Sequence, residues 1–248
     1  MVLLAHISDL HVGSSDQSAD RVRAIVSYLL GLARPVDAVV VTGDLAAKGT
    51  DEEYETLRYL LGPLKSLILC PGNHDHRSTL RNAMGFVSPD NDGPFNQWHR
   101  LDGAVVITCD STIPGRDEGE MSSDTLTWLD ATLDAARDVP ALVCMHHPPT
   151  PLHIPSFDVL GLRNPDALAT VVQRHDNVVG ILCGHAHSAS AARFHGIPVL
   201  VAPGVESTAI LPWESHYDRM KDEKAPPGIA FHVLRDGKLA THFRVITS

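Results

Sequence analysis

The sequence predicts an α/β fold in which short buried strands alternate with amphipathic helices around a largely buried sheet. Apolar, β-branched runs of strand length recur along the 248 residues, and segments with apolar residues at helical spacing separate them. A chain of this length can bury a substantial core, and no repeat, low-complexity tract or linker divides it. We therefore expect one domain over residues 1–248, with a hairpin-rich part from about residue 190.

The first elements are expected to be a strand, a helix, a strand and a helix. Val2 to Ser8 is an apolar run of strand length, and Ala19 to Leu32 carries apolar residues at helical spacing. Asp37 to Thr42 is so rich in valine that we expect both faces of this strand to be buried. Thr50 is a good N-cap, and the acidic residues after it suit the first turn of a helix that ends at Gly62-Pro63.

The middle of the chain continues this alternation, and the last fifth departs from it. A helix is expected at Ser123 to Ala136. Four more apolar runs are expected to be strands: Ser66 to Cys70, Ala104 to Cys109, Ala141 to Met145 and Val178 to Cys183. Ala191 to Ala202 and Ile229 to Val245 are typical of hairpins, the second turning at Asp236-Gly237.

Composition excludes several classes of protein. The formal net charge of −10, without clustered Lys and Arg, argues against general nucleic-acid binding and fits cation binding. No apolar stretch is long enough to span a bilayer, and the short apolar start lacks the basic leader of a secretory signal. None of the four cysteines forms a Cys-x-x-Cys pair, so we expect reduced core cysteines in a cytoplasmic protein.

Five of the expected strands end in residues that bind metal ions. These strand ends are Asp9-Leu-His11, Gly43-Asp44, Gly72-Asn73-His74-Asp75, His146-His147 and His185-Ala186-His187. Four of them are weak by themselves, since an aspartate after a glycine is often only a turn and a histidine at a strand end is often satisfied by backbone. Gly72-Asn73-His74-Asp75 is more specific. In open α/β sheets, however, the carboxyl ends of the strands line the ligand crevice. Five in succession make coincidence a poor explanation.

The donor types favour two transition-metal ions. Imidazole nitrogens combined with carboxylate oxygens suit Zn, Mn, Fe or Co, whereas oxygen ligands alone would suit Mg or Ca. Four ligands fill one tetrahedral site. Seven candidates, one of them a carboxylate able to bridge, therefore fit a pair of ions better than a single ion.

In these motifs the chain resembles the calcineurin-like metallophosphoesterases, and within them the class III cyclic nucleotide phosphodiesterases and related glycerophosphodiesterases. The resemblance runs from Asp9 to His187 with all five strand ends intact. Thr42-Gly-Asp-Leu45, Gly49-Thr-Asp-Glu-Glu-Tyr54 and His146-His-Pro-Pro149 fit this branch better than the Ser/Thr protein phosphatases or purple acid phosphatases. The resemblance implies a four-layer αββα sandwich of two mixed sheets with flanking helices, which the strand pattern alone does not establish.

The resemblance also implies three ligands for each ion and one shared carboxylate. It assigns Asp9, His11 and His187 to the first ion, Asn73, His146 and His185 to the second, and Asp44 to both. Of the histidine doublet, His146 matches the ligand and His147 does not. His74 matches the histidine that contacts the scissile phosphate, and we expect Asp75 to orient its ring.

The predicted function is hydrolysis of small phosphodiesters by attack of a metal-activated hydroxide on phosphorus. Cyclic nucleotides like 3′,5′-cAMP are the preferred substrates in this prediction. Two ions hold the phosphate oxygens and lower the pKa of a bound water, while His74 stabilises developing charge or protonates the leaving oxygen. A glycerophosphodiesterase or a broad-specificity diesterase or monoesterase are the alternatives among enzymes. A non-catalytic metal-binding scaffold is the alternative from another class.

The sequence leaves the native substrate, the metal pair and the oligomeric state open. The ions are divalent or trivalent Fe, Mn or Zn, with Co as a further choice. Loops are expected to set specificity, namely Gly115 to Ser122, Pro148 to Arg163 and Trp213 to Pro227. The hairpin-rich tail either caps the sheet or pairs with a second subunit in a homodimer.

The remaining aromatic residues have less specific interpretations. Trp213 is expected to anchor its loop on the core rather than to form an aromatic wall with Tyr217. His6 is expected in the core or behind the site. Packing or surface positions are expected for His99, His175, His195, His232 and His242, and roles stay open for His76, His147 and His216.

Overall fold

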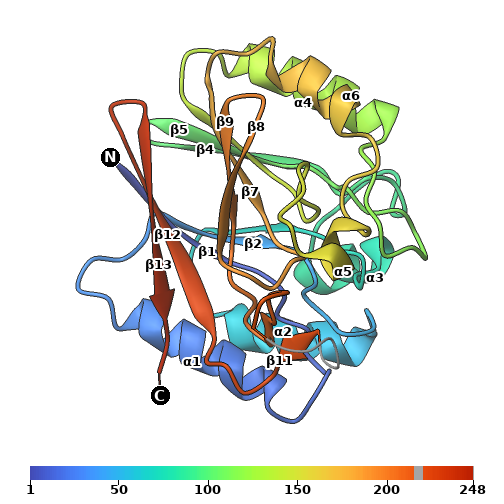
Figure 1. Cartoon of the computed structure of the whole chain (residues 1–248), viewed down its shortest axis with the longest axis vertical. Coiled ribbons are helices and arrows are strands. Elements are labelled where there is room, and N and C mark those ends of the chain that lie inside the picture. Colours follow the sequence, from blue (N-terminus) through green and yellow to red (C-terminus); the bar gives the residue numbers. More distant parts are fainter. Residues whose placement is uncertain (215–219, 248) are drawn as a thin grey trace.

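The computed structural model describes residues 1–214 and 220–247. Two large mixed sheets lie face to face, and helices cover the outer face of each (Figure 1). The four-layer αββα sandwich is therefore confirmed. The single buried sheet that the strand pattern indicated is wrong, because the strands divide between two sheets.

The first sheet holds the beginning and the end of the chain. Its strands, from edge to edge, are β13 (Lys238–Val245), β12 (Gly228–Arg235), β1 (Val2–Ile7), β2 (Ala38–Thr42) and β3 (Leu67–Cys70). The last three run parallel, and the β12–β13 hairpin joins β1 in antiparallel pairing. Two helices, α1 (Ser18–Leu30) and α2 (Asp51–Leu61), pack their apolar residues on the outer face.

The second sheet comes from the middle of the chain. Its strands, in order, are β4 (Gln97–Leu101), β5 (Ala104–Thr108), β6 (Ala141–Cys144), β7 (Val178–Cys183), β9 (Ile197–Val201) and β8 (Ser190–Phe194). The four inner strands are parallel, and both edge strands are antiparallel to their neighbours. Two helices, α4 (Ser123–Ala135) and α6 (Pro165–Val172), cover its outer face.

Four small elements lie in the connections beyond these strands. They are α3 (Arg77–Met84), α5 (Pro155–Asp158) and the two-stranded ribbon of β10 (Thr208–Ala209) and β11 (Lys221–Asp222). The sequence analysis expected loops where α5 and β11 lie, and it predicted no element at α3 or β10.

Apolar side chains form three layers that explain the stacking. Leu4 and Val40 of the first sheet pack between the sheets with Val106, Leu142 and Leu182 of the second. The other two layers lie between each sheet and its helices. Because inner strands such as β2, β5 and β6 are covered on both faces, they lack the alternation of apolar and polar residues that marks a half-exposed strand.

Most predicted elements are confirmed with shifts of one or two residues at their ends. Thr50 caps α2 as expected, because its hydroxyl accepts from the Glu53 amide while the Glu53 carboxylate accepts from the Thr50 amide. Both expected hairpins form, the second at Asp236-Gly237. The sequence analysis missed β4 and α6.

The cysteines and the helices bear on two further expectations. All four cysteines are buried and unpaired, as expected of core residues. Within residues 1–214 and 220–247, none of the helices combines the length and the apolar character that crossing a membrane would require.

Candidate metal centre

The seven expected ligands lie where strands of both sheets end, after β1, β2, β3, β6 and β7. Backbone hydrogen bonds join these strand ends across the sandwich. The Asp9 amide donates to the Gly43 carbonyl at 3.1 Å, and the Gly184 amide donates to the His146 carbonyl at 3.0 Å. The ring Nδ1 of His146 donates to the Thr42 carbonyl at 2.6 Å, which links the second sheet to the first.

One group of donors comes from the two ends of the motif series. The Nε2 atoms of His11 and His187 are 3.2 Å apart, and Asp9 Oδ1 is 3.5 Å from His187 Nε2. Donor atoms of all three residues lie within 4.8 Å of one another. The predicted ligands of the first ion therefore converge, although 176 positions separate His11 from His187.

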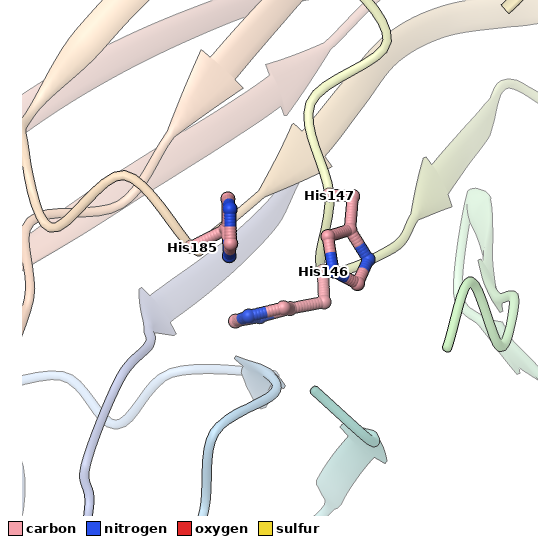
Figure 2. Close-up of side chains that lie close together, drawn as sticks. All are labelled: His146, His147 and His185. Carbon is pink, nitrogen blue, oxygen red and sulfur yellow. The ribbon is translucent and has the colours of Figure 1, made fainter. Parts of the chain in front are cut away.

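A second group forms around His146. Its Nε2 lies 3.1 Å from Asn73 Oδ1, and its ring centroid lies 5.1 Å from that of His185. Figure 2 shows His146 reaching towards the side of the site where His185 lies, at the ends of β6 and β7. These are the predicted ligands of the second ion.

Asp44 lies between the two groups. Its Oδ2 is 3.4 Å from Nε2 of His11 and 3.4 Å from Nε2 of His146. The side chain of Asp44 is only 4% exposed, and its Oδ1 accepts from the His74 amide at 3.0 Å. A single carboxylate oxygen thus faces a predicted ligand of each ion, which is a position that suits a bridging ligand.

Two buried polar atoms at the site have no hydrogen-bond partner in the described part of the chain, Asp9 Oδ2 and His185 Nε2. A buried acceptor left unpaired is costly, so such atoms call for an explanation. A cation held between imidazole and carboxylate donors would satisfy both. The Nδ1 atom of His187 lies 2.9 Å from the Ser207 hydroxyl, which leaves its Nε2 facing the cluster. The residues therefore fit a pair of transition-metal ions.

The backbone at the site is strained. Five of the site residues have positive φ angles: Asp9 (55°), His11 (40°), Asp44 (49°), His185 (69°) and His187 (49°). Residues with a Cβ atom avoid this left-handed region, at a cost of about 1 kcal/mol or more each. Strain concentrated at the ends of three strands is typical of a functional site.

Glycines make room for this arrangement. A Cβ atom on Gly72 would lie 2.2 Å from Asp44 Oδ1, and one on Gly43 would lie 2.5 Å from His146 Nδ1. Gly43 also has a φ of +89°, which other residues rarely adopt. The two glycines that follow β2 and β3 therefore let the backbone approach the bridging carboxylate and the His146 ring.

Burial and mutual charge set the protonation of the donors. Burial lowers the pKa of His11 to about 4 and that of His185 to about 3, so these rings are neutral and able to bind metal. Burial raises the pKa of Asp9 to about 7. Burial also opposes charge on Asp44 and His146, but their attraction prevails, lowering the pKa of Asp44 well below its usual value and raising that of His146 to about 9.

His74 lies beside the cluster. Its side chain is 42% exposed, and its Nε2 is 4.0 Å from Asp44 Oδ2. Its Nδ1 lies 2.9 Å from the Ala47 carbonyl and must therefore donate to it, which leaves Nε2 directed at the site. The ring is placed to meet a substrate held there.

The orienting role expected for Asp75 is corrected by the structure. Its carboxylate accepts from the amides of Leu45, Ala46 and Gly72 and from the Tyr54 hydroxyl, at 2.8–3.1 Å. The His74 ring is held by a backbone carbonyl instead. Asp75 therefore fastens the loops after β2 and β3 to each other, because those loops present several amides that no strand satisfies.

His147 lies close to both His146 and His185, but its ring nitrogens are already used. Nε2 lies 3.1 Å from the Asp117 carbonyl, to which it must donate, and Nδ1 accepts from the Ser111 hydroxyl at 2.8 Å. The closeness of the three rings in Figure 2 would allow a histidine metal trio. The hydrogen bonds of His147 argue against it, since neither nitrogen has a free lone pair.

The sequence analysis missed two residues at the site. Nζ of Lys221, on β11, lies 3.0 Å from Nε2 of His187. The Phe157 ring, on α5, has its centroid 5.9 Å from that of His185 and 6.0 Å from that of His187. Both residues come from loops that were expected to set specificity, but no local pattern distinguished them from their neighbours.

Other expectations for aromatic residues are corrected or lie outside the described residues. Trp213 is 74% exposed and does not anchor its loop on the core. His216 and Tyr217 fall among the residues that the structure does not describe. His232 is confirmed as a packing residue, since it is fully buried and pairs with His6 through ring nitrogens 3.0 Å apart.

Two cavities flank the donor groups. One of about 160 Å³ is lined mainly by the proline-rich loop after β6, with Phe157 and His185 on its wall. The other, of about 390 Å³, is bordered by Asn73, the start of α3 and residues 112–115. Each cavity thus touches a predicted ligand of the second ion.

Comparisons with known proteins agree with this geometry. A family model described as calcineurin-like phosphoesterase matches residues 2–189. The chain is 32% identical over 246 residues to the glycerophosphodiester phosphodiesterase GpdQ of Enterobacter lignolyticus, covering 93% of this chain and 86% of that protein. It is 34% identical over 210 residues to a probable cyclic nucleotide phosphodiesterase of Rhodococcus erythropolis, covering 80% and 69% of the two chains.

A solved structure extends the comparison to the whole fold. A dimetal phosphatase from Danio rerio aligns with a TM-score of 0.73 at 16% identity, covering 99% of this chain and 96% of that one. At this identity the likeness concerns the arrangement of the sheets and helices alone.

Proposed function

The chain belongs to the calcineurin-like phosphoesterase family. We propose that it hydrolyses small phosphodiesters at a binuclear metal centre, with 3′,5′-cyclic nucleotides as the preferred substrates. The observation that carries the proposal is the position of Asp44, whose Oδ2 lies 3.4 Å from the ring nitrogens of both His11 and His146. A metal-binding scaffold would not need His74 as well, beside that carboxylate and exposed to solvent.

Two ions meet the main difficulty of the reaction, which is attack on an anionic phosphorus centre. When bound, they supply Lewis acidity and lower the pKa of a coordinated water. The residues proposed to hold them are Asp9, His11 and His187 for the first, Asn73, His146 and His185 for the second, and Asp44 for both. Two sheets fix these side chains in advance, so little reorganisation is needed when the substrate arrives.

His74 is proposed to act on the leaving group. Its Nδ1 proton is committed to the Ala47 carbonyl, so Nε2 is the atom available to the substrate. A protonated Nε2 can donate to the leaving alkoxide as its bond to phosphorus breaks, which is general acid catalysis. Its exposure of 42% keeps it in exchange with solvent, from which it can regain the proton.

The geometry of the site fits more than one class of phosphodiester substrate. The relatives include proteins named for glycerophosphodiesters and for cyclic nucleotides, and both substrates are anionic diesters with a poor alkoxide leaving group. Initial rates on 3′,5′-cAMP, 2′,3′-cAMP and a glycerophosphodiester, measured side by side with the metal-loaded protein, test the choice. The highest kcat/KM on 3′,5′-cAMP supports the proposal, and a higher value on the glycerophosphodiester replaces it with the alternative.

The metals are proposed to be Fe, Mn or Zn, with Co able to substitute, because histidine and carboxylate donors suit these ions. Metal analysis of protein purified without chelators, followed by removal and restoration of each metal, tests this. Full activity with one equivalent of metal would contradict the binuclear centre.

A further inference from the structure

A small two-stranded ribbon, which the sequence analysis did not predict, brings Lys221 to the candidate metal centre. In the β10–β11 ribbon, Ala209 pairs with Lys221. The Ala209 amide also donates to the His187 carbonyl at 3.0 Å, and the neighbouring Ser207 hydroxyl contacts the His187 ring at 2.9 Å. The strand that carries Lys221 is therefore fastened, through β10, to the loop that carries His187.

The ammonium group of Lys221 lies beside the proposed donors of the first ion. Nζ lies 3.0 Å from His187 Nε2, the nitrogen proposed to bind that ion. Nε2 of His187 in turn lies 3.2 Å from Nε2 of His11 and 3.5 Å from Asp9 Oδ1.

A lysine at this place has an electrostatic consequence. An ammonium beside a divalent cation is repelled by it, and the repulsion is strong where water is excluded. An anion that contacts both cations removes the repulsion. The phosphate group of the substrate or product is an anion of the reaction that is large enough to contact both the ion and the ammonium group.

A second donor, His74, lies beside His11. The rings of His11 and His74 meet edge to face, with centroids 4.7 Å apart. His187 Nε2 lies 3.0 Å from Lys221 Nζ and 3.2 Å from His11 Nε2, so Lys221 and His74 both lie close to His11. A phosphate held at the first ion would thus have the imidazole of His74 and the ammonium of Lys221 within the same site.

We infer that Lys221 is a substrate-binding residue whose ammonium group contacts a non-bridging phosphate oxygen on the side of the first ion. The inference rests on the proposed phosphodiesterase function and deepens it. Its ligand class is a phosphate ester. A monoester product carries more negative charge than a diester substrate, so Lys221 holds the product more tightly than the substrate.

The test compares three variants of the metal-loaded protein. Lys221→Met removes the charge and keeps an unbranched side chain, and Lys221→Arg restores a cation. Lys224→Met is the matched control, since Lys224 is exposed in the same segment. Each variant is titrated with inorganic phosphate by calorimetry, and kcat and KM are measured with bis(p-nitrophenyl) phosphate at equal metal content.

We expect Lys221→Met to weaken phosphate binding about tenfold, as the loss of one charge-assisted hydrogen bond does. The KM for the diester should rise by a smaller factor, and Lys221→Arg should recover most of both losses. Phosphate affinity in Lys221→Met equal to that of Lys224→Met would overturn the inference. So would an arginine variant that loses as much affinity as the methionine variant, because that would mean a purely structural lysine.

Two further results stay distinguishable. If Lys221→Met loses its metals, the test uses the arginine variant at full metal content instead. The inference then requires that this variant binds phosphate. If the wild-type protein binds phosphate but hydrolyses no phosphodiester, the proposed function fails while the binding test of Lys221 stands on its own.

Discussion

Two groups of buried histidines lie in this sandwich, and they differ in how their hydrogen bonds are satisfied. His6 and His232 share faces of β1 and β12 with Leu4 and Leu234, which pack between the sheets. Their rings form a chain from the Thr42 hydroxyl to the Thr241 hydroxyl, with contacts of 2.8–3.0 Å at all four nitrogens. At the strand ends, by contrast, His185 Nε2 and Asp9 Oδ2 are buried and have no partner among the residues that the structure describes.

The difference teaches that burial of a histidine does not by itself indicate a site. The interior pair lies on regular strands, whereas His11, His185 and His187 all have positive φ angles. The pair is what packing produces when a polar ring is fully satisfied. Unpaired donors combined with backbone strain mark the group that is arranged for a ligand.

The strongest test of this comparison is Asp44→Asn at the metal centre. Loss of the bridging charge affects both donor groups, so we expect kcat/KM on bis(p-nitrophenyl) phosphate to fall roughly a thousandfold or more, with metal content below the wild-type value. Rate assays combined with metal analysis measure both effects. An active variant with two bound ions would show that Asp44 is not the bridge.

His74→Ala should have the next largest effect and should separate chemistry from metal binding. Removal of a general acid typically lowers the rate about 100-fold, and His74 is not a proposed ligand, so metal content should stay unchanged. His242→Ala, on the exposed strand β13, is the control. Wild-type kcat in the metal-loaded His74 variant would remove His74 from the reaction.

Metal affinity should rise with pH between about 6 and 9. Without metal, the pKa of His146 is about 9 and that of Asp9 about 7, so protons must leave these ligands before they bind an ion. Each displaced proton contributes about a tenfold gain in affinity for each pH unit below the pKa of its group. Zn²⁺ calorimetry in buffers of different ionisation enthalpy counts the protons, and binding without proton release would contradict the expectation.

The free energy of unfolding should depend on pH through the interior pair, His6 and His232, without any effect of this pair on metal binding. Burial lowers the pKa of His232 to about 3 and that of His6 well below its usual value. Below about pH 6.5 only the unfolded chain gains these protons, so stability falls as the pH drops, by about 1.4 kcal/mol per pH unit for each histidine. Urea unfolding at pH 5 and pH 7.5 measures this loss.

Substitutions at the pair sharpen the contrast and have the smallest expected effect. His232→Leu leaves His6 Nδ1 unsatisfied and should cost about 1–3 kcal/mol, whereas the double variant with His6→Leu should cost less and lose less stability in acid. Metal content should not change in either. A double variant as acid-sensitive as the wild type would show that other groups dominate the acid response.

Local sequence was enough to locate most strands and helices and to name the candidate ligands that the structure brings together. An apolar run followed by Gly-Asp or by His-x-His carries its information within a few residues, as at Asp44 and His185. The N-cap at Thr50 and the hairpin turn at Asp236-Gly237 are equally local. Edge strand β4 was harder, because its sequence Gln97–Leu101 is polar on one face and short.

The sequence by itself determined which residues end the buried strands and therefore which donors are available to a metal, because strand length, turn chemistry and donor type are properties of short segments. Only the tertiary structure decided that the strands divide between two sheets, that Asp44 lies between His11 and His146, and that Lys221 reaches His187. The tertiary structure also decided that the Asp75 carboxylate accepts hydrogen bonds from backbone amides and that His6 pairs with His232. These outcomes depend on the packing of two sheets, and contacts between residues as far apart as His6 and His232, 226 positions, leave no trace in any local period.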